Sequence, residues 1–558
     1  MPVKLRILLL ISLFCANAYA QELRALWVDA FHNGYFNSTQ TTALIADARA
    51  AKCNAIIVEV RKRGDAYYQG GIEPVATNVS PQTFDPLADL IQKGHTGSPR
   101  IEVHAWVVAY NIWGSQNSPP TQPTHPYNLH PDWLTQKIDG TQWDGSNYLF
   151  DPAHPSVQRH TFDVCMDIVS RYNVDGLHLD YIRYPDAGSS GGNQPWGYNP
   201  VSVARYKKLT STTATPSATD PAWLQWRRSQ ITALVRKIYL NIWAAKPGVR
   251  LSAALITYGN PPADLTLASW QSREAYSRTL QDWRGWMEEG ILDLACPMIY
   301  RDESTTAGFN GWADFAKDRK YNRAAAPGMG WYLNTVPNTH TQIALARDPT
   351  PSGNTAAGLV GYSYAVPNDD GTTQSSMWAQ LASGPFATTA TVPAMPWKTS
   401  TTKGHAMSTL TAADTGEEID GATITLTGPS NRTLLTDATG FWGAVDLPIG
   451  TYTLTVSQPG YIAHSRTFTV TGGSVAQPDT TLEIIPFQIT SATRNAATLT
   501  IAWNTVPGRA YRLEKSDDFQ TWMPASPSLT AAAASTSYVW QIPAGWETRG
   551  FLRVAQEP

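Results

Sequence analysis

Eight short apolar segments, separated by stretches with helical periodicity, occupy most of the chain between residues 23 and 365. They lie at residues 23–30, 54–61, 101–110, 174–182, 249–257, 291–301, 324–333 and 358–365. Most of them are nearly continuous in apolar side chains, which is typical of parallel strands covered on both faces. Predicted helices lie between them at residues 41–52, 86–94, 155–172, 221–245 and 271–290. This alternation predicts an α/β fold, a closed (β/α)8 TIM barrel in preference to an open sheet.

The barrel does not account for all 558 residues. We expect it to occupy residues 21–384, with long insertions at residues 114–145 and 186–200. The stretch at residues 385–404 is rich in Thr, Ala and Pro and has little periodicity, which predicts a linker.

Beyond the predicted linker the apolar period changes to two. Strict alternation occurs at residues 422–427, 450–456 and 466–471, between turn residues. This pattern predicts that the barrel is followed by two small all-β sandwich modules, at residues 405–485 and 486–558.

The first 20 residues have the pattern of a secretory signal peptide. Lys4 and Arg6 precede an apolar stretch, and Ala18-Tyr19-Ala20 matches a cleavage site. No later segment approaches eighteen consecutive apolar residues. We therefore expect a protein that is secreted, periplasmic or held at the cell surface, with no integral membrane segment after cleavage.

Composition narrows the classes of partner. The chain has 42 basic and 45 acidic side chains, a balance that argues against a nucleic-acid partner. Cys53, Cys165 and Cys296 are scattered and lie in apolar settings, so we expect buried thiols and no metal site or cofactor. The 21 Trp and 24 Tyr include more aromatic rings than a core requires, and such rings also form platforms for sugars.

In a (β/α)8 barrel the reactive side chains stand at the carboxyl ends of the strands. The polar and aromatic residues expected there, as substrate-binding side chains, are Asp29, Glu59, Arg61, His104, Trp106, Tyr110, Asn111, His178, Arg183, Tyr300, Asp302 and Trp331. A mouth rich in carboxylates and aromatic rings suits glycoside hydrolysis, which needs one carboxyl group to protonate the leaving oxygen and another to attack or to activate water.

Asp180 is the sharpest single candidate for a catalytic carboxylate. It ends an apolar strand, where an acid is costly unless it is paired or lies at the mouth. His178 shares its parity, so both side chains should point to one side of the strand. The alternative is an Asp that only holds Arg183 or His178 in place.

Glu59 and Arg61 share a parity in the second predicted strand. That arrangement is as compatible with a structural ion pair between neighbours as with catalysis. Glu73, in the following loop before Pro74, carries only a weak signal by itself, because most loop Glu side chains are simply solvated.

Several stretches together resemble the glycosyl-hydrolase-like 10 family, also described as DUF187, a group of bacterial (β/α)8 proteins. They are Leu26-Trp-Val, Val60-Arg61 with Gly64-Asp65-Ala66, Glu73-Pro74, Phe84-Asp-Pro-Leu87, His104-Ala-Trp106, Asp151-Pro-Ala-His-Pro155 and the run from Val174 to Pro185. The resemblance covers about residues 23–365. It implies glycosidase-like activity on a bacterial polysaccharide, with peptidoglycan glycan strands one known substrate class, and it makes Asp180 and Glu73 the matching acidic positions.

The two predicted β modules also resemble known domains. The stretch from Thr415 to Tyr461 resembles carboxypeptidase-regulatory-like domains, and the segment from Phe487 to Pro558 resembles fibronectin-III-like tails. Neither carries a catalytic constellation.

The sequence thus predicts a secreted or periplasmic glycoside hydrolase that acts on a bacterial or environmental polysaccharide or glycan strand. Its catalytic pair would be Asp180 and Glu73. The alternative is a non-catalytic carbohydrate-binding or surface-adhesion protein built on the same barrel.

Overall fold

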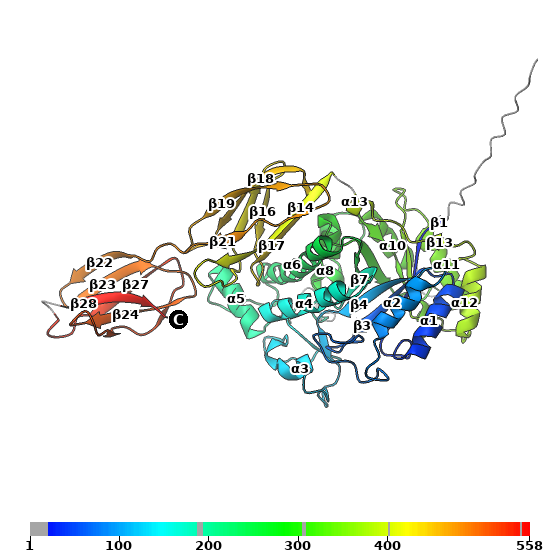
Figure 1. Ribbon diagram of the computed structural model, residues 1–558, viewed down its shortest axis with the longest axis horizontal. Coiled ribbons are helices and arrows are strands. Elements are labelled where there is room, and N and C mark those ends of the chain that lie inside the picture. Colours follow the sequence, from blue (N-terminus) through cyan, green and yellow to red (C-terminus); the bar gives the residue numbers. More distant parts are fainter. Residues whose placement is uncertain (1–19, 187–193, 304–307, 400–401, 547–549, 558) are drawn as a thin grey trace, which may run out of the picture.

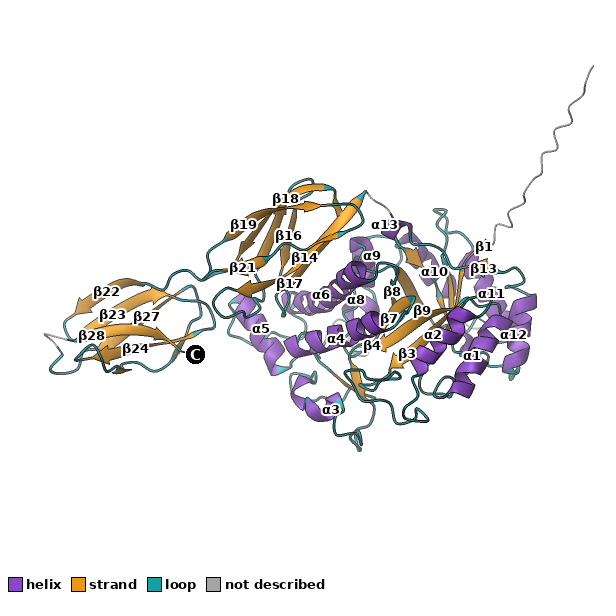
Figure 2. Ribbon diagram, in the orientation of Figure 1, coloured by secondary structure: helices purple, strands orange, loops and turns teal. Residues whose placement is uncertain are grey.

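The structure is a computed structural model that describes residues 20–186, 194–303, 308–399, 402–546 and 550–557. The predicted signal peptide, apart from Ala20, lies outside these ranges. Three parts follow one another along the chain: a barrel surrounded by helices and two β modules (Figures 1 and 2). Within the described residues, no helix is both long enough and apolar enough to cross a membrane.

The first part is a closed parallel barrel, as predicted. Its strands are β2 (Leu23–Val28), β3 (Ala55–Arg61), β4 (Glu102–Val108), β7 (Gly176–Asp180), β8 (Arg250–Leu255), β9 (Leu294–Ile299), β10 (Ala324–Ala325) with β11 (Gly328–Gly330), and β12 (Gly358–Tyr362). Neighbours pair in parallel in this order, and the pairing of β12 with β2 closes the ring. The seventh strand position is filled by two short pieces, β10 and β11, that both pair with β9.

Each barrel strand is buried on both faces. One core lies inside the barrel and includes Trp27, Trp106 and Cys296. The other lies between the strands and the helices and includes Val58 and Leu177. Because alternate side chains enter different cores, nearly every position is apolar, which explains the continuous runs in the sequence.

Helices cover the outside of the barrel. The main ones are α1 (Ser38–Ala50), α2 (Pro86–Thr96), α4 (Pro155–Arg171), α5 (Pro200–Thr210), α6 (Pro221–Ala245), α10 (Gly308–Asp318), α11 (Val336–Arg347) and α12 (Gln374–Ser383). Several begin with a capping side chain followed by Pro, which lacks the N–H that a first helical turn leaves unpaired. Asp85 caps α2 in this way by accepting the Ala88 N–H.

The single helix predicted at residues 271–290 is broken into three. They are α7 (Leu267–Gln271), α8 (Glu274–Ser277) and α9 (Trp283–Glu289). Leu280 adopts a left-handed φ of 55°, which no helix interior accommodates. Asp282 then starts α9 by accepting the Gly285 N–H. Apolar periodicity continued across this break because Leu280 and Trp283 are both buried.

The long insertion after β4 is ordered by short elements of its own. These are β5 (Asn111–Trp113), α3 (Pro126–Leu129), the 3-10 turn η1 (Pro131–Trp133) and β6 (Tyr148–Leu149). β5 and β6 pair with each other, and Asn111, which begins β5 shortly after the end of β4, lies opposite Leu149. Of the other predicted insertion, residues 186–200, residues 187–193 lie outside the described residues.

Two all-β modules follow, as predicted. The first packs the sheet of β14 (Lys403–Ala412), β17 (Phe441–Pro448), β20 (Val475–Ala476) and β21 (Thr480–Leu482) on the sheet of β15 (Thr423–Thr427), β16 (Arg432–Leu435), β18 (Gly450–Ser457) and β19 (His464–Val470). The second contains β22 (Ile489–Asn495), β23 (Thr498–Asn504), β24 (Ala510–Ser516), β25 (Met523–Pro524), β26 (Leu529–Thr530), β27 (Ser535–Gln541) and β28 (Phe551–Gln556) around a separate core.

The segment predicted as a linker is held against the barrel. Its β13 (Ala390–Thr391) pairs with β1 (Ala20–Gln21), and α13 (Pro396–Thr399) follows. The Trp397 indole N–H donates to Asp293 at 2.7 Å, and the Lys398 ammonium lies 2.7 Å from the same carboxylate. These contacts fix the chain at the amino-terminal end of the barrel, away from the ends where reactive side chains stand.

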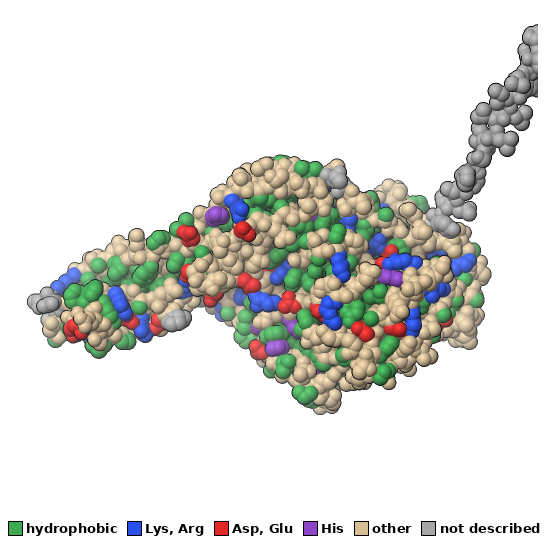
Figure 3. All heavy atoms as spheres, viewed as in Figure 1, with side chains coloured by type: hydrophobic (Ala, Val, Ile, Leu, Met, Phe, Trp, Pro, Cys, Tyr) green, Lys and Arg blue, Asp and Glu red, His purple; other side chains and the backbone are tan. Residues whose placement is uncertain are grey.

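The first β module docks on the barrel through charged and aromatic contacts. Arg205 on α5 forms a two-pronged ion pair with Asp420, at 2.8 and 3.0 Å. Arg323 pairs with Asp446 at 3.1 Å, and the Trp243 ring lies 4.2 Å from the His405 ring. On the face drawn in Figure 3, basic and acidic side chains are interspersed.

Candidate active site

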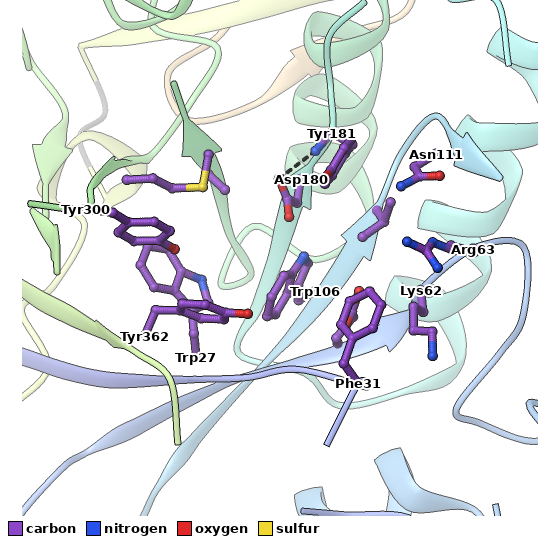
Figure 4. A pocket seen from close by; sticks show the side chains of 14 residues that line it. Trp27, Phe31, Lys62, Arg63, Trp106, Asn111, Asp180, Tyr181, Tyr300 and Tyr362 are labelled. Atoms are coloured by element: carbon purple, nitrogen blue, oxygen red, sulfur yellow. Dashed lines mark hydrogen bonds between the residues drawn. The ribbon is translucent and has the colours of Figure 1, made fainter. Parts of the chain in front are cut away.

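A pocket opens at the carboxyl ends of the barrel strands. Its volume is about 690 Å³, open solvent at the mouth included. The lining residues come from most of the barrel strands and the loops after them: Trp27, Phe31, Glu59, Lys62, Arg63, Trp106, Val108, Asn111, Asp180, Tyr181, Ala254, Met298, Tyr300 and Tyr362 (Figure 4). This is the position at which (β/α)8 enzymes carry their reactive groups.

Asp180 stands at the end of β7, at the centre of this pocket (Figure 4). The chain turns sharply after it, because Tyr181 adopts a left-handed φ of 48°. This turn brings the Tyr181 N–H onto the Asp180 Oδ1 at 2.6 Å. Burial raises the pKa of Asp180, and the Arg183 charge, the Tyr181 N–H and the neighbouring Trp106 indole N–H only partly oppose that rise.

Glu59 on β3 is the other carboxylate that lines the pocket. Its Oε2 accepts the Ala30 N–H at 2.6 Å, and the side chain is 1% exposed. Burial raises the pKa of Glu59 well above its ordinary value, and the charges of Asp180 and Asp29 raise it further. Glu59 and Asp180 therefore form a pair of buried acids that interact through the pocket.

The register of the strands explains why these two acids face the same space. Glu59 lies opposite Trp106 on β4, and Trp106 lies opposite His178 on β7. Side chains at this level point into the barrel, where Ile57 and Trp106 belong to the inner core. Asp180 is two residues further along β7, so it keeps the inward direction. Trp106 lies between the two acids.

Aromatic rings form one wall of the pocket. Tyr300 and Tyr362 stack with ring centroids 5.5 Å apart and an interplanar angle of 13°. The Trp27 ring meets both of them edge-on, at 6.4 Å. Such a wall offers flat, largely apolar surfaces with polar edges, which is the arrangement that pyranose rings contact.

The opposite wall carries two cations. Lys62 and Arg63 follow β3 directly, and both lie against Phe31, with the Lys62 Nζ 4.7 Å and the Arg63 Cζ 5.1 Å from the ring centroid. Asn111 lies on the same side (Figure 4). Phe31 itself is 56% exposed at the mouth.

His178 and His104 lie below the pocket rather than in it. The Trp27 indole donates to His178 Nε2 at 3.1 Å, so the ring proton is on Nδ1, which lies 2.8 Å from Ser252 Oγ. Burial lowers the pKa of His178 to about 3, and the ring is neutral. His104 is fully buried, 3.0 Å from Glu102. The His178 ring lies 5.7 Å from the Trp27 ring and 6.2 Å from the Trp106 ring, so His178 supports the floor of the pocket.

Glu73 does not line the pocket. Its two carboxylate oxygens accept hydrogen bonds from the Arg61 guanidinium, both at 2.7 Å, and Oε1 also lies 2.8 Å from His160 Nε2. Burial alone would raise the pKa of Glu73, but the Arg61 charge and the hydrogen bonds from His160 and Arg61 outweigh it and hold the pKa well below its ordinary value. The predicted pairing of Glu73 with Asp180 stays a prediction, and this geometry gives Asp180 a different neighbour, Glu59.

A β-bulge separates Arg61 from Glu59. Two steps on β3, from Glu59 to Arg61, oppose one step on β4, from Trp106 to Val107. The extra residue reverses the direction of Arg61, which points toward the helical layer beside Cys165. The prediction that Glu59 and Arg61 point to the same side of the strand is therefore wrong. The ion-pair partner of Arg61 is Glu73.

The remaining predicted residues fall into three groups. Trp106, Asn111 and Tyr300 line the pocket as expected, with Glu59 and Asp180. Tyr110 and Trp331 are fully buried in the outer core. Asp29, Arg183 and Asp302 are near the strand ends without lining the pocket: Asp29 Oδ1 accepts the Phe31 N–H at 2.9 Å, and the Arg183 guanidinium lies 4.3 Å over the Tyr181 ring.

Sequence reasoning missed several lining residues, namely Trp27, Phe31, Lys62, Arg63, Tyr181 and Tyr362. Trp27 and Tyr362 carried a usable signal, because each shares the inward parity near the end of a barrel strand. Lys62 and Arg63 carried none, since a bulge and a loop decide their direction.

The pocket has no metal ligand set. Among the described residues, no group of three His, Cys, Asp or Glu side chains is arranged to hold a metal ion. Cys53, Cys165 and Cys296 are buried thiols, as predicted.

A (β/α)8 barrel with two carboxylates and an aromatic wall in a pocket at its carboxyl end has the arrangement expected of a glycosidase-like protein. Residues 22–342 match the glycosyl hydrolase-like 10 family, and the chain belongs to this family. Residues 408–483 match the carboxypeptidase regulatory-like domain.

Two curated relatives are similar to part of the chain. The chain is 26% identical over 356 residues to glycosyl hydrolase YngK of Bacillus subtilis (strain 168), over 60% of this chain and 62% of that protein. It is 26% identical over 286 residues to glycosyl hydrolase DigH of Escherichia coli (strain K12), over 47% of this chain and 59% of that protein. The match thus spans less than two thirds of each relative.

Among solved structures, the glycoside hydrolase domain of PgaB from Bordetella bronchiseptica is similar with a TM-score of 0.45 and 14% identity. The alignment covers 62% of this chain and 95% of that one.

Proposed function

We propose that this protein is a glycoside hydrolase that cleaves a bacterial or environmental polysaccharide outside the cytoplasm, with Asp180 and Glu59 as its carboxyl pair. The observation that carries the proposal is that these two buried acids line one pocket whose other wall is aromatic. The signal-like pattern at residues 1–20 supports export.

The environments of the two acids support different roles. Burial and two acidic neighbours raise the pKa of Glu59 most, so it retains a proton and serves as the general acid for the leaving oxygen. Asp180 is near Arg183 and accepts the Tyr181 N–H, which favour its ionised form. Asp180 then attacks the sugar or activates water.

The glycan strands of peptidoglycan are the first substrate to test, since the family includes proteins that act on them. Reducing ends released from peptide-free glycan strands and from a panel of plant and algal polysaccharides are measured for the unaltered chain and for Asp180→Asn. Asp163→Asn, an exposed change on α4, is the matched control.

We expect the unaltered chain and Asp163→Asn to release reducing ends from at least one glycan, and Asp180→Asn to release none above background. A folded Asp180→Asn protein with full activity would contradict the assignment. Glycan binding without any release of reducing ends would favour the alternative of a non-catalytic carbohydrate-binding barrel.

A further inference from the structure

One wall of the pocket is aromatic and uncharged, and the opposite wall carries two cations. This difference indicates the chemical class of the substrate. We propose that Lys62 and Arg63 bind a carboxylate carried by the sugar on their side of Asp180, so that the substrate is a carboxylated glycan. This inference rests on the proposed carbohydrate site and names the chemistry that the site selects.

Lys62 and Arg63 are the cations that line the pocket, and neither forms an ion pair among the described residues. Lys62 Nζ donates to the Ala30 carbonyl at 3.2 Å, and Arg63 Nη2 donates to Asn147 Oδ1 at 2.9 Å. Both contacts are to neutral groups, so the two positive charges are held in place without a directly paired carboxylate. A cation that is oriented but not in an ion pair is available to bind an anion.

Asn111 provides a second, independent sign of a ligand on this wall. Its side chain lines the pocket and is 3% exposed. Its Oδ1 is buried and has no hydrogen-bond partner among the described residues. Buried acceptors are nearly always paired in folded proteins, so an unpaired one in a pocket calls for a donor from the ligand. A sugar hydroxyl or amide N–H supplies such a donor.

The balance of charge in the pocket agrees with a ligand that carries one negative charge. The ionisable lining groups, apart from tyrosines, are Glu59, Asp180, Lys62 and Arg63. Burial and neighbouring acids raise the pKa of Glu59, which favours its protonated form. With Glu59 protonated, the two cations face the single carboxylate of Asp180, and the guanidinium fork of Arg63 suits a planar carboxylate on the ligand.

The carboxylated sugar would occupy one side of the cleavage point only. Figure 4 places Lys62, Arg63 and Phe31 on one side of Asp180 and Trp106, and Tyr300 and Tyr362 on the other. A sugar with an apolar face fits the tyrosine side. The structure thus predicts that the two sugars flanking the bond differ in charge.

The test measures binding without turnover, in the full chain carrying Asp180→Asn. Probes are peptide-free peptidoglycan glycan strands, the same strands methyl-esterified on their lactyl carboxylates, chitin oligosaccharides, and oligogalacturonates. Titration calorimetry at low and high salt gives the affinities. The same probes are applied to chains that also carry Lys62→Gln, Arg63→Gln or both, and to the exposed control Lys403→Gln.

We expect at least one carboxylated probe to bind about tenfold or more tightly than its neutral counterpart, and each Gln substitution to reduce that affinity about tenfold. The lactyl and uronate probes separate the two sources of a carboxylate. High salt should weaken binding of the carboxylated probe alone. Lys403→Gln should change nothing, and calorimetric unfolding shows that each variant is folded.

Equal binding of charged and neutral strands, or losses that are equal for both in Lys62→Gln and Arg63→Gln, would overturn the inference. If the unaltered chain hydrolyses esterified strands as fast as charged ones, the proposed function stands and this inference falls. If carboxylated strands bind through Lys62 and Arg63 but no glycan is cleaved, the inference stands and the hydrolase function falls.

Discussion

Two buried glutamates near β3 have opposite environments. The Glu59 side chain points into the barrel, and Glu73 lies on the other side of the strand. Glu73, behind the strand, is enclosed by Arg61 and His160, which satisfy both carboxylate oxygens. Glu59, inside the barrel, has one backbone N–H as its hydrogen-bond donor and two further acids nearby. Both side chains are almost fully buried, yet their pKa values move in opposite directions. Compensation by hydrogen-bond donors and opposite charge, rather than burial, distinguishes the environments of the two acids.

The difference between Glu59 and Glu73 leads to several predictions, and the largest expected effect is on catalytic activity. Glu59→Gln removes the proton donor and should lower kcat/KM about 10²–10⁴-fold on any glycan that the chain cleaves. Glu73→Gln should keep kcat near that of the unaltered chain, counted per folded molecule. Initial rates of reducing-end release, normalised to active folded protein, measure both. A large loss of kcat in folded Glu73→Gln with full activity in Glu59→Gln would restore Glu73 as the partner of Asp180.

The unfolding free energy should rank the two variants in the opposite order, with Glu73→Gln the more damaging change. Glu73→Gln leaves the Arg61 guanidinium buried without its counter-charge, which should cost about 3–5 kcal/mol of unfolding free energy. Glu59→Gln keeps an acceptor for the Ala30 N–H and removes an uncompensated acid, so stability should stay level or rise. Scanning calorimetry of the barrel transition measures the difference. The double variant Arg61→Met, Glu73→Leu should recover part of the loss, and a further loss in it would argue against the ion-pair explanation.

The pH dependence of these stabilities should also have opposite signs. The folded pKa of Glu73 lies below its ordinary value of 4.5, so its contribution is complete above 4.5 and is lost as the pH falls through 4.5 toward the folded pKa. The folded pKa of Glu59 lies above 4.5, so the unfolding free energy falls as the pH rises from 4.5 to the folded pKa, and the loss is complete above the folded pKa.

The advantage of the unaltered chain over Glu73→Gln should therefore shrink in acid, and the advantage of Glu59→Gln over the unaltered chain should grow as the pH rises. Melting temperatures of the three proteins over a common pH series measure both trends. Parallel curves for all three would show that neither pKa is shifted as described.

The smallest predicted effect concerns the aromatic wall. Tyr362→Ala removes the ring that stacks on Tyr300, and we expect KM to rise about two- to tenfold with little change in kcat. Tyr332→Ala is the matched control, since Tyr332 contacts both rings from the rim without lining the pocket. Equal effects of the two changes on KM would mean that the wall acts only through packing.

Most of the barrel could be predicted because each strand is buried on both of its faces. Two cores demand apolar side chains at nearly every position, and this requirement is visible in one chain without its neighbours. The broken helix between residues 271 and 290 could not be predicted, because Leu280 stays apolar while its backbone leaves the helical region. Periodicity records which side chains are buried and not which backbone carries them.

The residues of the candidate site also include some that could be predicted from the sequence and some that could not. Asp180 was predictable, since an acid that ends an apolar strand is expensive anywhere but at a mouth. Trp331 was not, because its ring turns outward from a short irregular segment and packs near Trp378 instead of facing the pocket.

The sequence by itself determined the barrel, the two β modules and the position of Asp180, because these follow from local rules of burial and alternation. Only the tertiary structure decided which carboxylate accompanies Asp180 in the pocket. One extra residue in β3 reverses the direction of Arg61, the last residue of the strand, so its side chain leaves the barrel interior and meets Glu73 in the outer layer. A bulge depends on the pairing of two strands, and that pairing exists only in the folded chain.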